Sequence, residues 1–376
     1  MLQVGELTAQ VKQAAQEAGF DLAGVARVAD FSELNYFPQW IADGYAGEMK
    51  YLEARDASGN LKRANLGRVA PWARSVIVCA MNYNTAEPYS IAGDHAHQGW
   101  ISRYAWSQED YHQAVMGRLR RVEAGLKDAL AHDARQAFPK LGETPELRTR
   151  CYVDTGPLVE RVYAKYAGIG WIGKNTCLLN QKIGSWLFLG VILTSIDLAA
   201  DLPSPDRCGT CTRCIAACPT DALTEPYRLD SNRCISYLTI EKRGSITESM
   251  RDGMGRHVFG CDICQDVCPW NRRAPVSSAP EFQPREGLVN PALEWLAEMT
   301  EEGFRRQFRG SPVRRTKRSG MRRNAVVAMG NSGDPRFLSL LERLAADADA
   351  VLAEHARWAR KKLLAGSVPQ DQRQRG

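Results

Sequence analysis

The chain has 376 residues, of which 44% are hydrophobic and 24% charged, and its formal net charge is +6. This balance is that of a globular protein and excludes a disordered or fibrous chain. No apolar run reaches the length of a membrane span, and residues 1–17 contain no apolar signal region. We therefore expect two or three domains, no membrane association and a place in the cytoplasm.

Helical and strand-like segments alternate over residues 1–200. Helical periodicity runs from Leu7 to Ala18, stops at Gly19, and returns as a long helix over residues 111–130. The apolar runs 22–26, 75–81 and 186–194 predict strands. The alternation predicts an α+β protein whose first domain, residues 1–200, is of the α/β type.

Eight of the eleven cysteines lie between residues 208 and 268. The first four have the spacing C-x2-C-x2-C-x3-C before a proline, which is typical of bacterial ferredoxins with two [4Fe–4S] clusters. They are Cys208, Cys211, Cys214 and Cys218. The later run, Cys261, Cys264 and Cys268, repeats the pattern with one cysteine missing, which Cys234 can supply. This predicts a loop-rich ferredoxin-like domain over residues 201–275.

In two-cluster ferredoxins the fourth cysteine of each run binds the cluster of the other run. We assign the first cluster to Cys208, Cys211, Cys214 and Cys268, and the second to Cys218, Cys234, Cys261 and Cys264. Zinc also binds C-x2-C pairs, and disulfides are typical of small secreted chains. Four cysteines within eleven residues of a long chain favour clusters over both. Cys79, Cys151 and Cys177 are expected to be packing residues.

The pattern becomes helical from about residue 288. Ser311 and Pro312 form a helix start, and the helix is expected to continue to Gly330. Further helices are predicted over residues 334–344 and 350–364. Helix pairs joined by short Gly, Asp and Pro turns predict a HEAT-like helical platform over residues 276–376.

Residues 305–323 contain nine basic residues, eight of them arginine, and no acidic residue. Most charge runs are solvated helix faces, but such faces usually mix charges of both signs. The planar guanidinium of arginine suits phosphate groups. A nucleic-acid-binding face is therefore favoured over a simple solvated one.

Several further motifs resemble those of one known family. They are C-Y-V-D-T-G-P-L-V-E-R at 151–161, I-S-R-Y at 101–104, G-W-I-G-K-N-T at 170–176, C-I-S-Y-L-T at 234–239, G-C-D at 260–262 and R-R-T-K-R-S-G at 314–320. With the cysteines and the basic segment, they make nearly the whole chain resemble epoxyqueuosine reductase. This family carries out the last step of queuosine synthesis in tRNA and depends on cobalamin.

The resemblance implies the cofactors, partners and site residues. The cofactors are two [4Fe–4S] clusters and cobalamin, and the partners are a tRNA carrying epoxyqueuosine and an unidentified electron donor. Asp154 matches the proton donor. The implied cobalamin contacts are Arg63, Asp154, Ser236, Cys261 and Asp262, and the implied tRNA contacts are Arg314, Arg315, Lys317 and Arg318.

Asp154 has two interpretations. As a general acid it must hold a proton near neutral pH, so we expect burial to raise its pKa. Without the resemblance, an aspartate before Thr155-Gly-Pro157 is more readily a turn or helix-cap residue. The six histidines are scattered and form no ligand pattern.

Two other protein classes are compatible with the cysteines: an iron–sulfur electron-transfer protein without a corrinoid, and a corrinoid reductive dehalogenase. The long segment before the cysteines argues against the first, and the arginine-rich segment argues against the second. We expect a monomer, because no heptad or exposed apolar helix stands out.

Overall fold

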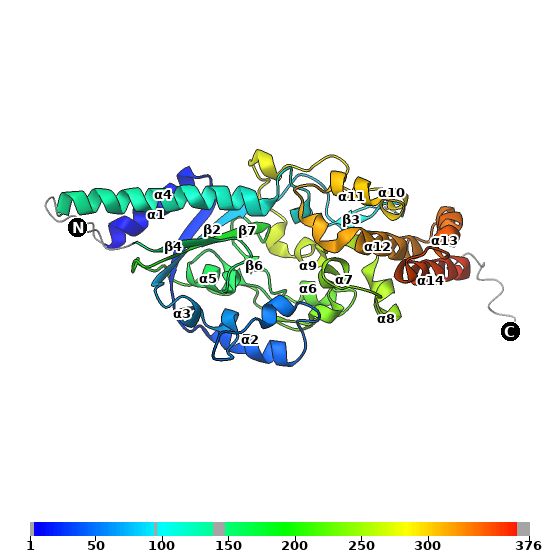
Figure 1. Ribbon diagram of the computed structural model, residues 1–376, viewed down its shortest axis with the longest axis horizontal. Coiled ribbons are helices and arrows are strands. Elements are labelled where there is room, and N and C mark those ends of the chain that lie inside the picture. Colours follow the sequence, from blue (N-terminus) through cyan, green and yellow to red (C-terminus); the bar gives the residue numbers. More distant parts are fainter. Residues whose placement is uncertain (1–3, 94–95, 138–146, 367–376) are drawn as a thin grey trace.

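The computed structural model describes residues 4–93, 96–137 and 147–366, and its first half is built on a four-stranded sheet (Figure 1). The strand order is β1 (Leu22–Arg27), β2 (Ser75–Asn82), β7 (Leu187–Thr194) and β4 (Thr149–Tyr152). Three of these strands were predicted and are confirmed, whereas β4 was not predicted. Every pair is antiparallel, so this mixed helix-and-strand part has an α+β sheet instead of the parallel sheet typical of α/β domains.

Helices cover both faces of the sheet (Figure 1). One face packs against α1 (Val4–Glu17) and the long α4 (Tyr111–Ala137), both predicted. The other packs against α2 (Ser32–Ala42), α3 (Leu66–Val69) and α5 (Glu160–Tyr166). All eight residues of β2 are therefore buried, which explains their continuous apolar sequence.

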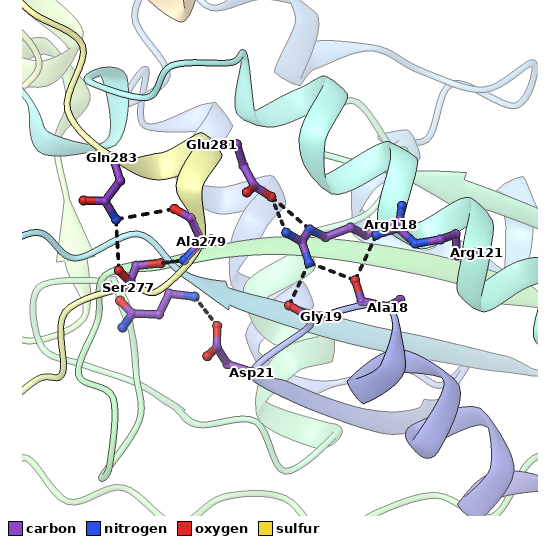
Figure 2. Close-up of polar contacts among 10 residues, drawn as sticks. Ala18, Gly19, Asp21, Arg118, Arg121, Ser277, Ala279, Glu281 and Gln283 are labelled. Carbon is purple, nitrogen blue, oxygen red and sulfur yellow. Dashed lines mark hydrogen bonds and ion pairs between the residues drawn. The ribbon is translucent and has the colours of Figure 1, made fainter.

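Gly19 ends α1 at a point where two segments meet (Figure 2). Arg118 of α4 donates to the carbonyl oxygens of Ala18 and Gly19 at 2.9 and 3.2 Å, and it pairs with Glu281. Gly19 has a φ of +87°, and a Cβ there would lie 1.9 Å from the Arg118 guanidinium. Glycine is thus required both by the backbone and by the arginine.

We predict that Gly19→Ala destabilises the protein by about 1–3 kcal/mol, because the methyl group strains the turn and displaces Arg118. Thermal unfolding of this variant and of Gly5→Ala measures the effect, since a Cβ at Gly5 meets nothing within 4 Å. Equal melting temperatures for both variants would contradict the close approach.

The cysteine-containing segment consists of short elements. Its helices are α6 (Arg213–Ala216), α7 (Ile235–Ile240), α8 (Glu248–Arg251) and α9 (Ile263–Asp266). There are also two small antiparallel pairs of strands. One pair is β5 (Trp171–Ile172) with β6 (Leu178–Leu179), and the other is β8 (Leu223–Glu225) with β9 (Arg228–Leu229). In addition, β3 (Trp100–Ile101) pairs in parallel with β10 (His257–Phe259). Residues 100–106 consequently share a core with the C-terminal helices. The three-domain division at residues 200 and 275 stays a prediction.

The C-terminal part contains α10 (Leu293–Ala297), α11 (Glu301–Gln307), α12 (Lys317–Asn331), α13 (Leu338–Leu344) and α14 (Ala350–Gly366). The single helix expected from Pro312 to Gly330 is wrong in its first turns. Pro312–Thr316 form a 3-10 turn capped by Ser311, and α12 begins only at Lys317, which has a φ of +60°. None of the described helices is long and apolar enough to cross a membrane.

Helix α12 lies in the middle of the C-terminal part. Residues 320–330 are buried throughout, and the helix packs against α10 and α14. The HEAT-like arrangement stays a prediction, because a central, fully enclosed helix is not by itself a stacked repeat.

Candidate active site and cluster ligands

The eight predicted cluster cysteines lie in two groups of four. Burial and the neighbouring thiols of Cys208 and Cys214 raise the pKa of Cys268 to about 11, and Cys214 also lies near Cys211. Helices α6 and α9, which carry cysteines of the two runs, lie side by side (Figure 1). The first group therefore contains the fourth cysteine of the later run.

The second group is built in the same way. Burial raises the pKa of Cys261, and the nearby thiols of Cys234 and Cys218 add to this effect. Cys264 lies beside Cys261 and Cys234. Within the described ranges, no three ligand side chains converge around a single-ion site. A [4Fe–4S] cluster requires four thiolates, and each group supplies four.

A ninth cysteine lies beside the second group. The thiol of Cys177 is hydrogen-bonded to that of Cys264, which raises the pKa of Cys264. Asn175, next to it in the same hairpin, donates to the carbonyl oxygen of Cys264 at 3.2 Å. The expectation that Cys177 is a packing residue and not a ligand stays a prediction, and Cys79 is fully buried in β2 as expected.

Asp262 connects the second group to the I-S-R-Y segment. Its carboxylate is 1% exposed and accepts hydrogen bonds from Trp100 Nε1 at 3.0 Å, from the Arg103 backbone at 2.8 Å, and from the Ser102 hydroxyl. These donors occupy both carboxylate oxygens. The predicted cobalamin contact at Asp262 is therefore retained only for its backbone.

Asp154 follows β4 in a tight turn, with a φ of +61° that aspartate tolerates better than most residues. Its carboxylate accepts a hydrogen bond from the Tyr111 hydroxyl at 3.1 Å and lies 3.8 Å from His112 Nε2. Among the described residues, no backbone N–H bonds to this carboxylate. Asp154 is thus in a turn, but its side chain faces the start of α4 and does not serve as a turn or helix cap.

The expected rise in the pKa of Asp154 is wrong for this structure. The interaction with His112, whose Nε2 lies 3.8 Å away, lowers the pKa and outweighs the effect of burial, and Tyr111 and Arg315 lower it further. The side chain is also 58% exposed, so water stabilises the carboxylate. Asp154 is consequently ionised at neutral pH in this state.

His112 was missed in the sequence and lies between two carboxylates. Its Nδ1 is 2.8 Å from Asp110 Oδ1, and its Nε2 faces Asp154. Burial opposes the charge on the imidazole, but both carboxylates outweigh it and raise the pKa to about 9. The only sequence signal for a functional His112 was Asp110, two residues before it at the start of a predicted helix. The contact with Asp154 could not be predicted, because Asp154 lies far from His112 in the sequence.

Glu160, the first residue of α5, lies near Asp154 and Arg63. Burial raises the pKa of Glu160 to about 7, and Oε1 is buried without a hydrogen-bond partner in the described chain. Arg63 donates to the carbonyl oxygen of Leu158 at 3.2 Å. A buried polar atom beside a guanidinium is suited to a polar ligand.

The segment predicted to bind tRNA is only partly at the surface. Arg314 and Lys317 are exposed and, together with Glu301 and Arg318, line a surface hollow of ≈ 520 Å³. Arg318 also donates to the carbonyl oxygen of Met299 at 2.7 Å. The hollow is basic because three of these four side chains are cationic.

Arg322 and Arg323 do not belong to that face. Both are buried and donate to backbone carbonyls, Arg322 to Ala297 and Arg323 to Leu238. The interpretation of all nine basic residues as one nucleic-acid-binding face is therefore wrong. Sequence alone did not distinguish a buried arginine that caps carbonyls from an exposed one.

Arg315 connects the basic segment to Asp154. It pairs with Glu241 at 2.6 Å, and its guanidinium lies 5.2 Å from the centre of the exposed Tyr51 ring. Its charge contributes to the low pKa of Asp154. On the other side, Tyr104 lies near both Asp154 and Asp262, which follows Cys261. Asp154 therefore lies between the basic segment and the second cysteine group.

Comparisons with known proteins agree with this arrangement. The family model for epoxyqueuosine reductase QueG, DUF1730, matches residues 63–155, and the model for a 4Fe-4S double cluster binding domain matches residues 207–271. The epoxyqueuosine reductase of Synechocystis sp. is 44% identical over 306 residues, 81% of this chain and 98% of that protein. That of Xanthomonas campestris pv. campestris is 36% identical over 358 residues, 94% of this chain and 95% of that protein.

A similar fold is found in a solved structure. The crystal structure of epoxyqueuosine reductase with an epoxyqueuosine-modified tRNA-Tyr stem loop has a TM-score of 0.83 and 28% identity, and the alignment covers 96% of this chain and 91% of that one. The sequence relatives exclude the electron-carrier and dehalogenase alternatives, since each aligns over almost its full length. This chain belongs to the epoxyqueuosine reductase family of oxidoreductases and carries that family's double [4Fe–4S] cluster binding domain.

Proposed function

We propose that this protein reduces epoxyqueuosine to queuosine at the wobble position of tRNA, with electrons passing through two [4Fe–4S] clusters to cobalamin. Two observations carry the proposal: the charge of Arg315 of the basic segment acts on Asp154, and Tyr104 lies near both Asp154 and Asp262, which follows Cys261 of the second cysteine group. The structural relative named above was solved with a tRNA stem loop carrying that modification.

The cluster ligands are proposed as two sets of four. Cys208, Cys211, Cys214 and Cys268 hold the outer cluster, and Cys218, Cys234, Cys261 and Cys264 hold the inner one. Thiolates are the ligands that such clusters require, and the grouping of the thiols supports this division.

Cobalamin is proposed to bind beside the inner cluster, where Arg63, Asp154, Ser236, Cys261 and the backbone of Asp262 contact it. Glu160 Oε1, buried without a partner, fits a site that a polar group completes. When bound, cobalamin supplies low-valent cobalt as the reductant of the epoxide. His355 is not available as a ligand, because it is buried and both ring nitrogens are bonded, Nδ1 to the Val351 carbonyl and Nε2 to the Ile246 backbone N–H.

The tRNA is proposed to lie over the basic segment, with its phosphates at Arg314, Arg315, Lys317 and Arg318. The guanidinium of arginine can donate two parallel hydrogen bonds to one phosphate group. Each such contact releases counterions from the nucleic acid, which adds to the affinity. A flipped-out nucleoside is proposed to lie over Asp154, because the charge of Arg315 acts on that carboxylate. The reaction proposed for this tRNA implies a cytoplasmic protein.

The reaction consumes two electrons and two protons, and the epoxide oxygen leaves as water. Asp154 donates a proton to that oxygen as it departs. In the resting site Asp154 is ionised and His112 holds the proton. Covering Asp154 with substrate removes water from its carboxylate, which favours transfer of the proton from His112. His112 thus acts as the proton store that reloads Asp154.

His112→Gln should lower turnover by about 10-fold to 100-fold, because Asp154 loses its proton source. In the unmodified protein the pKa of His112 is about 9, so the rate should be steady below that pH and fall above it. The variant should lack this fall. The other charged or titratable groups near His112 and Asp154 are Asp110, Tyr111, Glu160 and Arg315. Rate profiles from pH 6 to about 10 test this.

The exposed neighbour Gln113 provides the control for this profile. Gln113→Ala should retain both the rate and the decline above about pH 9. A His112→Gln variant with an unchanged profile would show that the histidine merely packs against Tyr111, whose ring stacks on it at 4.0 Å.

An anaerobic conversion assay tests the proposed function. The protein, loaded with clusters and cobalamin, is mixed with a strong reductant and tRNA carrying epoxyqueuosine. The tRNA is then digested, and the masses of its nucleosides are measured by mass spectrometry. We expect a product lighter by one oxygen atom, and only when cobalamin is present. Conversion without cobalamin, or none with both clusters intact, would overturn the proposal.

A further inference from the structure

The outer cysteine group is carried partly by a loop at the surface. The loop of the outer group is open to solvent, since Gly209, Thr210 and Thr212 are exposed. The inner group lies beside the buried Asp262 and, through Tyr104, close to Asp154. Electrons from another protein therefore reach the outer group first, because transfer rates fall steeply with distance.

Basic side chains surround the outer group. Arg207 precedes Cys208, Arg213 precedes Cys214, and Lys174 Nζ donates to the carbonyl oxygen of Gly209 at 2.6 Å. Trp270 and Cys208 pack against the small cluster that contains Cys268, and a second basic pair follows Trp270 by two and three residues in the chain. The whole set, called here the basic rim, is Lys174, Lys182, Arg207, Arg213, Arg272 and Arg273.

The position of Lys182 follows from a neighbouring turn. The turn between Asn180 and Gly184 carries this lysine, and Gly184 is so close to residues 270–274 that a Cβ would lie 3.1 Å from Ala274 Cβ. The exposed Lys182 is therefore two residues from a point of contact with the segment that carries Arg272 and Arg273, which are also exposed.

The basic rim is not neutralised within the described chain. Arg207, Arg213, Arg272, Arg273 and Lys182 are exposed and make no ion pair there. Other exposed arginines do pair with a carboxylate, as Arg305 does with Glu301 and Arg343 with Glu298. The three segments carrying the rim have one exposed acidic residue, Asp206, whose carboxylate bonds to Tyr227 and to the Cys208 backbone. The result is a positive surface centred on the outer cysteines.

We propose that the basic rim is the docking surface for a small acidic ferredoxin, which gives electrons to the outer cluster one at a time. Charge complementarity steers such encounters and sets their rate more than their affinity. Plant-type ferredoxins are low-potential carriers that give up one electron at a time. Each encounter oxidises the ferredoxin by one electron and reduces one cluster by one, and two encounters supply one epoxide reduction.

This inference rests on the proposed function only for its direction of electron flow. The test omits tRNA and cobalamin, so its outcome is separate from that of the conversion assay. Photoreduced acidic [2Fe–2S] ferredoxin is mixed with the oxidised two-cluster protein in a stopped-flow instrument, and the loss of cluster absorbance is followed at several salt concentrations. Binding of oxidised ferredoxin is measured in parallel by calorimetry.

Arg272→Glu combined with Arg273→Glu should lower the second-order rate constant at low salt by about 10-fold or more, and weaken binding. The rate should also lose most of its salt dependence. Reduction by dithionite should be unchanged, which excludes damage to the cluster. The control is Arg120→Glu combined with Lys361→Glu, which changes the net charge by the same amount at exposed positions on α4 and α14. The second-order rate constant of this control variant should stay within about twofold of that of the unmodified protein.

An equal loss in both double variants would overturn the proposal, since it would reflect total charge. An unchanged rate in the Arg272 and Arg273 variant would overturn it as well. The competing occupant is RNA: if this variant loses affinity for tRNA and keeps its rate with ferredoxin, the basic rim belongs to the nucleic acid.

Discussion

Asp154→Asn is expected to lower the rate of epoxide reduction by about 10²–10⁴-fold, while both clusters and tRNA affinity are retained. An amide has the size of the carboxyl group and tolerates the same positive φ, so the turn after β4 should keep its shape. It still accepts the hydrogen bond of the Tyr111 hydroxyl, but it has no acidic proton to give. The rate constant of a single turnover on saturating tRNA measures the loss.

The exposed neighbour Thr155 lies in the same turn and serves as a control. Thr155→Ala should retain the rate, because its side chain makes no contact with His112. Glu160 is the competing acid, since burial raises its pKa to about 7. Full turnover in Asp154→Asn together with its loss in Glu160→Gln would transfer the acid role to Glu160.

Cys234→Ala is expected to remove the inner cluster and to abolish turnover. A [4Fe–4S] cluster without one of its four thiolates is poorly held, and the electron path from the outer cluster is interrupted. Iron analysis should fall by about half, because the outer set of four cysteines is untouched. Electron paramagnetic resonance of the reduced protein should then show one isolated cluster, without the coupling of a neighbouring pair.

The matched control is Cys177→Ala. This thiol is hydrogen-bonded to Cys264 but belongs to neither proposed ligand set. Full iron content and a shifted potential of the inner cluster are expected, since a hydrogen bond to a ligand sulfur tunes the potential. Loss of half the iron in Cys177→Ala, but not in Cys234→Ala, would exchange the roles of the two cysteines.

The cysteine spacing and the apolar runs predicted the features that depend on short segments of the sequence. Strands β1, β2 and β7 were located to within two residues, because an unbroken apolar run bounded by turns has few other interpretations. The pairing of Cys268 with the first run was also expected, since it follows from a repeated local motif. These are properties of short segments, and a sequence displays them directly.

The missed features depend on contacts between distant segments. The pairing of β3 with β10 places Trp100, Ser102 and Arg103 around Asp262, about 160 residues away. The meeting of His112 with Asp154 likewise depends on how α4 lies over the sheet. No local pattern encodes either contact, and the same is true of the burial of Arg322 and Arg323 in α12.

The central claim is that electrons held by the clusters of this chain reduce the epoxide of the tRNA. A single-turnover titration tests it most directly. The two-cluster, cobalamin-loaded protein is reduced, freed of excess reductant and mixed with tRNA carrying epoxyqueuosine, and cluster oxidation and nucleoside product are counted in the same sample. We predict one queuosine for every two electrons lost from the protein. Cluster oxidation without product, or product without cluster oxidation, would contradict the account.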